Sequence, residues 1–273
     1  MHIRVDHHTS YEYDRPIHSL IQLLRLSPRN HDTQTVRRWQ INLNVDGALK
    51  AGEDSFGNVT HMLSLAGPLS SLTVAIEGEV ETSDSHGLVT GTPERFPSRF
   101  YLRNTRLTEA DAEIMTFARD TAADGETIDR LHRLLSALYT NLSFDAAATH
   151  VGTTAAQAFA AGRGVCQDFA HVFIAAARCL GIPARYVGGH LYRSDGARVQ
   201  EAGHAWAEAY VDNLGWIGFD AANGVCITDA YVRVSAALDY LGAAPVRGAW
   251  SGIANEELTV AVTVDQARNQ YQN

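Results

Sequence analysis

The chain has 273 residues, of which 45% are hydrophobic and 19% are charged, and it carries a net charge of −9. This composition is typical of a soluble globular protein with one large domain or two smaller ones, and it excludes disordered and collagen-like chains. The acidic balance argues against a nucleic-acid partner, for which a basic surface is needed.

Three cysteines are too few for a disulfide framework, so we expect reduced thiols and a cytoplasmic location. The N-terminus has neither the apolar core nor the cleavage site of a secretory signal. No run approaches the roughly 20 apolar residues that cross a bilayer, and we therefore expect no membrane association.

The first 82 residues alternate between apolar and polar positions, which is the pattern of half-buried strands. Strands are predicted over residues 3–13, 39–45 and 72–80. Residues 54–58 read Asp-Ser-Phe-Gly-Asn, and their glycine and asparagine predict a tight turn between strands. This half of the chain is expected to be β-rich.

Glycines and prolines interrupt the alternation over residues 83–106, and we place a domain boundary near residue 100. Beyond it the apolar positions follow the period of a helix. Thr108 and Asp111 form a variant capping pattern that predicts the start of the first helix. Two further helices are predicted over residues 128–138 and 154–162, the last one ended by a glycine.

The last third of the chain contains a predicted helix from Cys166 to Leu180, which is apolar enough to be mostly buried. Gly181 and Pro183 end this helix. Further strands are predicted at 184–191, 203–211, 215–220 and 258–264, and a turn at 212–215 joins the second and third of these into a hairpin.

Cys166 stands where a glycine-containing segment enters the predicted buried helix. Free N–H groups and the positive end of the helix dipole stabilise a thiolate there, and the same groups could hold an oxyanion. Cys179 and Cys226 are more simply explained as small apolar residues. Cys166 differs because polar residues flank it at a helix end.

His204 and Asp220 complete a possible set of reacting groups. His204 lies near the start of the strand predicted at 203–211, which has large or polar residues at even positions and alanines at most odd ones, and Asp220 ends the next strand. His204 and Asp220 each lie eight residues from Asp212, which stands at the turn. The two residues therefore reach about the same level of the hairpin, provided that the turn is bulged or distorted. A nucleophile, a base and an orienting carboxylate are the groups that acyl transfer through a thioester requires.

At these residues the sequence resembles the transglutaminase-like superfamily. The matching segments are 164–171 (GVCQDFAH), 181–187 (GIPARYV), 203–206 (GHAW) and 216–220 (WIGFD). The first half resembles the β-rich domain that precedes this core in a bacterial subgroup, at residues 11–16, 24–29 and 54–58.

The resemblance implies an α+β fold, with an N-terminal β-rich domain over residues 1–100 and a papain-like catalytic core over residues 101–273. It also implies that Cys166 is the nucleophile, His204 the base and acid, and Asp220 the orienting residue. The subgroup generally has a Gly-Arg-Asp-Tyr run near the C-terminus, whereas residues 237–240 read Ala-Leu-Asp-Tyr here. If the missing arginine positions substrate in relatives, this chain has a different specificity.

Four further residues are candidates for substrate contact or for support of the site: Gln167, Asp168, His171 and Trp206. His171, His190 and His204 could converge with Cys166 on a zinc ion. No Cys-x-x-Cys pair or His-Glu-x-x-His helix is present, so we expect neither a metal nor another cofactor.

The predicted activity is that of a peptidase or amidase acting on a peptide or protein substrate through a thioester on Cys166. Two alternatives stay open. One is a transglutaminase that passes the acyl group to an amine, and the other is a non-catalytic peptide-binding protein of the same fold. Hydrolysis is favoured because water is always available and because bacterial relatives of this subgroup resemble peptidases.

Overall fold

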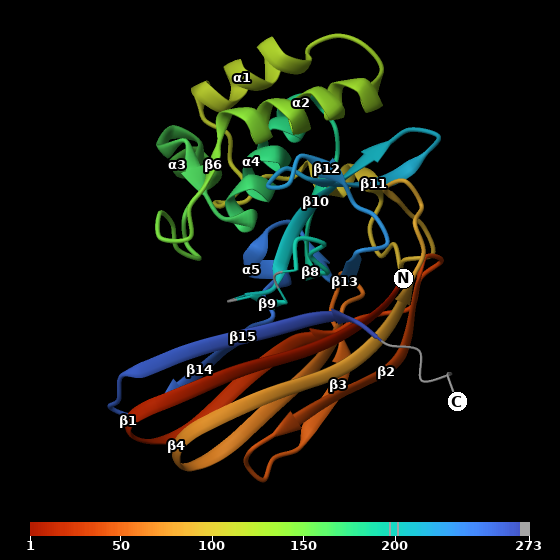
Figure 1. Cartoon of the computed structure of the whole chain (residues 1–273). Helices are drawn as coiled ribbons and strands as arrows, with labels where there is room; N and C mark the ends of the chain where they lie inside the picture. The colour runs from red at the N-terminus through yellow and green to blue at the C-terminus, as the bar shows by residue number, and fades with distance from the viewer. Residues whose placement is uncertain (197, 201, 268–273) are drawn as a thin grey trace, which may run out of the picture.

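The computed structural model describes residues 1–196, 198–200 and 202–267 and has two antiparallel sheets, with most of the helices on one side (Figure 1). The first sheet contains β1 (His2–Ser27), β2 (Gln34–Leu43), β3 (Leu49–Glu53), β4 (Val59–Thr82), β9 (Val199–Gln200), β14 (Val246–Ser251) and β15 (Glu256–Gln266). The second sheet contains β5 (Leu88–Val89), β8 (Ala184–Leu191), β10 (His204–Val211), β11 (Gly215–Asp220), β12 (Val225–Cys226) and β13 (Tyr231–Ala237).

Helical segments and one short parallel strand pair complete the described fold. The helices are η1 (Ser98–Leu102), α1 (Ala112–Ala122), α2 (Thr127–Asn141), α3 (Ala155–Ala161), α4 (Cys166–Cys179) and α5 (Tyr240–Ala243). The parallel pair consists of β6 (Ser143–Phe144) and β7 (Arg163–Gly164).

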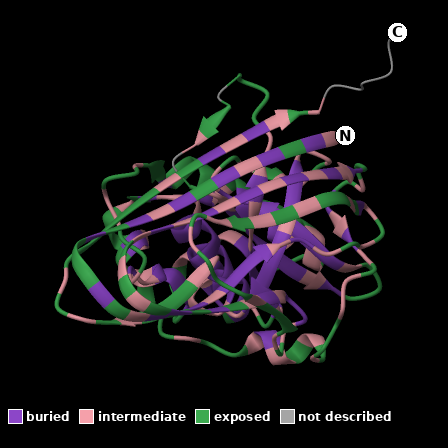
Figure 2. Cartoon of the chain, turned by 90° about the horizontal axis from the view of Figure 1, so that it is seen from below, coloured by how far each residue is buried: buried purple, intermediate pink, exposed green. Residues whose placement is uncertain are grey.

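The first sheet is bent so that its two halves face each other. Its two longest strands, β1 and β4, run through both halves. One buried cluster contains Tyr11 and Leu24 from β1 together with Leu63 and Ile76 from β4, so both halves of each strand face a shared core. Buried and exposed residues alternate along these strands, as Figure 2 shows. The β-rich first half is therefore confirmed, with the second predicted strand ending at Leu43.

The C-terminal strands return to this first sheet. β15 pairs antiparallel with β1 from Ile3–Gln266 to Tyr13–Glu256, which confirms the late strand predicted at 258–264. β14 pairs with the second half of β1. The sheet thus takes strands from both sides of residue 100, and the domain boundary near that residue stays a prediction.

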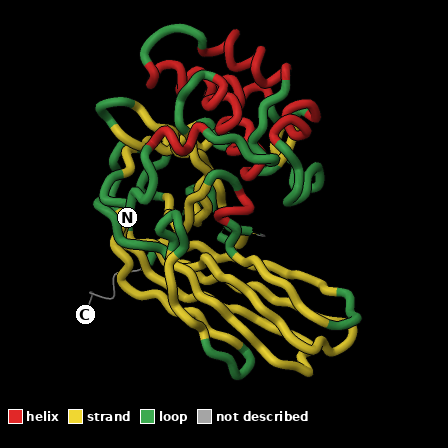
Figure 3. The backbone as a smooth tube through the Cα atoms, turned by 180° about the vertical axis from the view of Figure 1, so that it is seen from behind, coloured by secondary structure: helices red, strands yellow, loops and turns green. Residues whose placement is uncertain are grey.

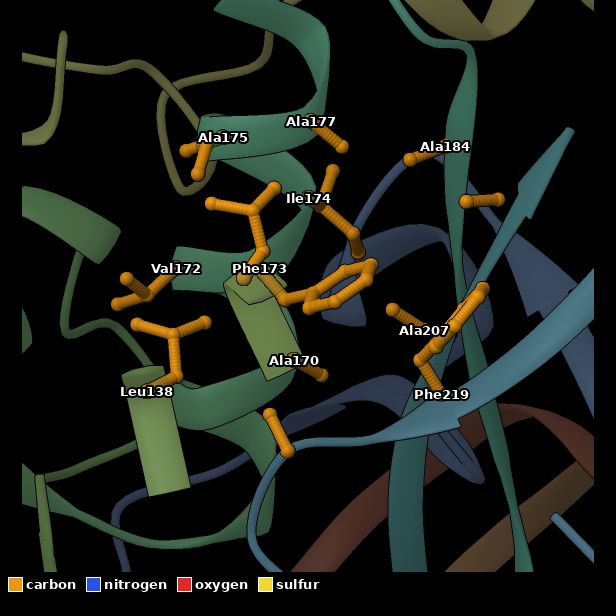
Figure 4. Close-up of a cluster of buried hydrophobic side chains, with 14 of the residues drawn as sticks. Leu138, Ala170, Val172, Phe173, Ile174, Ala175, Ala177, Ala184, Ala207 and Phe219 are labelled. Atoms are coloured by element: carbon orange, nitrogen blue, oxygen red, sulfur yellow. The ribbon is translucent and has the colours of Figure 1, made fainter. Parts of the chain in front are cut away.

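Helices α1, α2, α3 and α4 gather on the side of the second sheet that faces away from the first sheet (Figure 3), whereas the short α5 lies beside β8 and β13 (Figure 1). α4 is buried from Gln167 to Arg178, and it contacts β10 on one side and α1, α2 and α3 on others. Phe173 of α4 stacks on Phe219 of β11 with ring centroids 5.2 Å apart (Figure 4). The alanine positions of β10 belong to the same core, so the small side chains let the helix approach the strand closely.

Two helix starts were predicted from capping patterns, and one of them is wrong. α1 is capped by Asp111, whose Oδ1 accepts a hydrogen bond from the N–H of Ile114 at 2.9 Å. Thr108 lies before the helix, fully buried, and accepts a hydrogen bond from Nη1 of Arg178 at 2.6 Å. For α3 the predicted capping box is confirmed, and the helix ends at Gly162, which has a φ of 65°.

Two side-chain amides, one in β2 and one in the turn before β4, bind β13, an edge strand of the second sheet. Oε1 of Gln34 accepts from the N–H of Arg233 at 2.7 Å, and Nε2 donates to the Arg233 carbonyl at 2.9 Å. Asn58 binds Ala236 in the same way, at 2.8 and 2.9 Å. These bonds satisfy backbone groups that an edge strand otherwise leaves free.

The segment with Asn58 is the turn predicted at 54–58, and the structure confirms it between β3 and β4. Oδ1 of Asp54 accepts hydrogen bonds from the N–H groups of Phe56 and Asn58, at 2.9 and 3.0 Å.

Among the described residues, no helix is both long and apolar enough to cross a membrane.

Candidate active site

Cys166 is the first residue of α4 and is half-buried, whereas the residues that follow it are buried. Asp168 closes the first turn: its Oδ2 accepts from the N–H of Val165 at 2.8 Å, and its own N–H donates to the Val165 carbonyl at 2.8 Å. A Cβ at Gly164 would lie 2.6 Å from Oδ2 of Asp168, so this turn needs a glycine there. The predicted placement of a cysteine at a helix start is confirmed.

His204 lies between Cys166 and Asp220. Its Nε2 is 2.6 Å from Oδ2 of Asp220, and its ring lies near enough to Cys166 for that residue to raise the pKa of the imidazole. Burial by itself lowers the pKa of His204, but the charge and the hydrogen bond of Asp220, together with the influence of Cys166, outweigh burial and raise the pKa to about 10. His204 is therefore an imidazolium at neutral pH.

The contact between His204 and Asp220 was predicted, but the register that produces it differs from the one expected. β10 and β11 pair with Ala207 opposite Phe219 and Val211 opposite Gly215. Continuing this register places Asp220 opposite Trp206, so His204 and Asp220 are diagonal neighbours. The two-residue difference keeps both side chains on one face of the sheet. Residues 212–214 form the turn, with positive φ at Asn213 and Gly215, 67° and 98°, and among the described residues no bulge interrupts the pairing of β10 with β11.

Asp220 is fully buried and its carboxylate accepts several further hydrogen bonds. Oδ2 accepts from Nδ2 of Asn223 at 2.7 Å and from the hydroxyl of Tyr231 at 2.8 Å. Oδ1 accepts from the N–H groups of Ala222 and Asn223 at 3.1 and 3.2 Å. Burial raises the pKa of Asp220, but the charge of His204 and these hydrogen bonds bring it below its usual value.

Asn223 and Tyr231 were not predicted from the sequence. Asn223 has a sequence signal, because an aspartate followed by Ala-Ala-Asn-Gly is typical of a turn in which the carboxylate accepts nearby N–H groups. Tyr231 has none, because it comes from β13, which lies beyond β8 in the sheet order and approaches Asp220 only through the tertiary fold.

Gln167 and Asp168, two of the further candidates, bind the segment that precedes α3. Nε2 of Gln167 donates to the carbonyl of Val151 at 3.4 Å, and the hydroxyl of Thr149 donates to Oδ2 of Asp168 at 2.6 Å. Burial raises the pKa of Asp168. Both side chains thus connect the helix start to a neighbouring segment.

His171 and Trp206 are fully buried. Nε2 of His171 accepts a hydrogen bond from the N–H of Tyr240 at 3.1 Å, and burial lowers the pKa of His171 to about 4, so the ring is neutral. The ring of Trp206 stacks beside His204 with centroids 6.3 Å apart and meets the ring of Tyr231 at 5.4 Å. Trp206 therefore packs behind the imidazole.

The histidines considered for zinc do not converge. His190 packs against His7 of the first sheet, with ring centroids 5.7 Å apart. Its neighbour Gly189 is the partner of His204 in the β8–β10 register, so His190 points to the other face of the sheet. Within the described ranges, no group of three or more His, Cys, Asp or Glu residues is placed to hold a metal ion.

Residues 115–221 match the Transglutaminase-like superfamily, and residues 3–81 match the Bacterial transglutaminase-like N-terminal region. The chain belongs to this superfamily, in the bacterial group that carries this N-terminal region. An uncharacterized protein of Mycobacterium leprae is 30% identical to it over 276 residues, which are 96% of this chain and 98% of that protein. An uncharacterized protein of Mycobacterium tuberculosis strain H37Rv is 28% identical over 287 residues, 96% of this chain and 91% of that protein.

A solved structure of a "Putative Cysteine Protease" from Cytophaga hutchinsonii has a TM-score of 0.78 to this chain at 19% identity, and the match covers 100% of this chain and 93% of that one. This likeness shows a shared fold. It confirms the predicted α+β architecture, a β-rich N-terminal region followed by a transglutaminase-like core. The family and this fold support a cysteine-dependent enzyme.

Proposed function

We propose that this protein is a peptidase or amidase that hydrolyses a peptide or carboxamide bond through a thioester on Cys166. The observation that carries the proposal is His204, which lies 2.6 Å from Asp220 and near Cys166, the first residue of a buried helix. These are the groups and the order of contact that an activated thiol nucleophile needs.

In the first step the Cys166 thiolate attacks the carbonyl carbon of the substrate. A carbon–sulfur bond forms and the carbonyl oxygen takes up the negative charge. Within the described part of the chain, the backbone N–H groups of Cys166 and Gln167 donate to no other residue, since they lie in the first turn of α4. They support the proposal because they can stabilise this oxyanion.

In the second step the oxyanion collapses, the carbon–nitrogen bond breaks, and the His204 imidazolium gives its proton to the departing amine. Nε2 of His204 is held by Asp220, so Nδ1 is the ring nitrogen that serves Cys166 and the amine. Water then attacks the thioester, neutral His204 takes a proton from it, and the carbon–sulfur bond breaks. A carboxylic acid leaves and the thiolate–imidazolium pair is restored.

Hydrolysis is proposed over transamidation because it needs no binding site for a second substrate. The proposed substrate is a peptide or protein, and the proposed location is the cytoplasm, where reduced thiols persist. An amine that replaced water in the last step would give the transglutaminase reaction from the same thioester.

A library of amide and peptide substrates tests the proposal. We expect turnover by the wild-type protein and by Cys226→Ser, and its loss in Cys166→Ser. Cys226 is a matched control because it is also a half-buried free cysteine of the catalytic part. Adding a primary amine should leave the products unchanged; an amide product formed from the amine would favour the transglutaminase. Equal turnover by Cys166→Ser would overturn the proposal.

A further inference from the structure

One oxygen of Asp220 has three side-chain hydrogen-bond partners. Oδ2 accepts from His204, Asn223 and Tyr231, at 2.6, 2.7 and 2.8 Å. A carboxylate oxygen shared among several donors offers less negative charge to each of them. The strength with which Asp220 holds the His204 proton therefore depends on the other two donors.

Tyr231 is placed to act only as a donor. It is 7% exposed, and its ring packs against the rings of Trp206 and His204 at 5.4 and 6.0 Å. Burial and the nearby charge of Asp220 raise the pKa of Tyr231 far above its usual value. Its hydroxyl thus keeps its proton at neutral pH.

The first sheet fixes the strand that carries Tyr231. Tyr231 is the first residue of β13, and Gln34 of β2 binds both backbone groups of Arg233, two residues further on. On the other side, Tyr231 is paired with Leu191 of β8. The hydroxyl is therefore positioned by both sheets, which gives the N-terminal part of the chain a role at the site.

We propose that Tyr231 is a positioning residue that acts through Asp220: its hydroxyl orients the carboxylate and limits how tightly the carboxylate holds the His204 proton. The consequence for turnover rests on the function proposed above, because His204 must release this proton to the departing amine. A carboxylate that bound the imidazolium too tightly would slow that release.

The test is Tyr231→Phe, with Tyr13→Phe as a matched control. Tyr13 is also buried, at 6% exposure, and its hydroxyl also donates to a carboxylate, that of Glu256 at 3.0 Å. The readouts are the NMR signals of His204 in protein labelled with ¹⁵N-histidine, followed over pH, and the steady-state kinetics.

In Tyr231→Phe we expect the Nε2–H proton of His204 to move downfield and the ring to stay protonated to a higher pH. We expect kcat to fall about tenfold with KM unchanged, the effect of losing one hydrogen bond to a charged group. Tyr13→Phe should change neither. Asn223→Ala removes another donor from the same oxygen and should shift the NMR signals in the same direction, which keeps the test valid if Tyr231→Phe does not fold.

The proposal is overturned if the His204 NMR signals of Tyr231→Phe match those of the wild type. If Tyr231→Phe does not fold, the same comparison is made with Asn223→Ala, and matching signals overturn the proposal. The NMR measurement needs no turnover. Failure of the proposed function, seen as unchanged turnover in Cys166→Ser, is therefore distinguishable from failure of the role assigned to Tyr231.

Discussion

Nε2 of His204 lies 2.6 Å from Oδ2 of Asp220, although these two residues are not directly opposite in the β10–β11 pairing. The diagonal contact is possible because side chains two residues apart on a strand share a face and histidine is long enough to reach across. The remaining acceptor sites of Asp220 are filled by the turn that follows β11 and by Tyr231. The carboxylate is thus held rigidly beside the imidazolium.

The His204–Asp220 pair predicts a loss of stability at alkaline pH. The pKa of His204 is about 10 in the folded protein and about 6.5 when the chain is unfolded. The stabilisation is therefore fully present below about pH 6.5 and is lost as the pH rises toward 10. Urea unfolding at several pH values should show this decline in the wild type and a flatter profile in His204→Gln. Parallel profiles for the two proteins would contradict the raised pKa.

His7 and His190 predict a second loss of stability, at acidic pH. Burial lowers the pKa of His7 to about 4 and that of His190 to about 3, with each also lowered by a neighbouring histidine. In the unfolded chain both histidines have a pKa of about 6.5, so below that pH the unfolded chain binds protons that the folded protein does not. The stability associated with the two neutral histidines is therefore present above about pH 6.5 and is lost as the pH falls below it.

Replacing His190 by Phe should make the free energy of unfolding less dependent on pH between about 6.5 and 4. His86→Asn is the control, because the His86 side chain is 96% exposed, and this variant should follow the wild type. The acid sensitivity would have another origin if His190→Phe and the wild type lost stability in parallel.

Asn58→Ala should loosen the contact between the two sheets. The change removes two hydrogen bonds to Ala236 and leaves its buried N–H and carbonyl without partners, at a cost of about 2 kcal/mol. Asn44→Ala removes a single exposed bond to the N–H of Thr73 and should cost less than about 1 kcal/mol. Urea unfolding measures both, and equal losses would contradict the importance of the contact at Ala236.

Iodoacetamide at pH 7 should alkylate Cys166 faster than Cys179 or Cys226. Cys166 lies beside His204 and at the start of α4, where free N–H groups can stabilise negative charge that develops on the sulfur. Partial burial of the thiol raises the pKa of Cys179 and of Cys226, so both react slowly. Cys179 as a whole is exposed at the end of α4, which differs from the packed small apolar residue expected from the sequence. Peptide mapping at short times gives the three rates, and His204→Ala should slow only the first.

The parts of the site that could be predicted have local signals. Cys166 follows a glycine-containing segment at the start of an apolar stripe, and His204 and Asp220 lie on consecutive strands joined by a short turn. The first helix start was misplaced because Asp111 and Thr108 are both good capping residues, and only the buried partner of Thr108, Arg178, decides between them.

Tertiary contacts set the rest of the site, and the sequence does not show them. Tyr231 reaches Asp220 only because β13 pairs with β8, and β13 in turn is bound by Gln34, 199 residues away in the chain. The return of β14 and β15 to the first sheet depends likewise on pairing with β1. Alternating apolar residues predict a strand but leave its partner undetermined.

Trapping the acyl-enzyme tests the central claim most directly. The protein is mixed with an activated ester, quenched in acid within the first turnover, and examined by intact-protein mass spectrometry followed by peptide mapping. We predict one acyl group per chain, located on Cys166, which is absent in Cys166→Ser, accumulates slowly in His204→Ala and still forms in Cys226→Ser. An acyl group on another residue, or an unchanged adduct in Cys166→Ser, would contradict a thioester mechanism at this site.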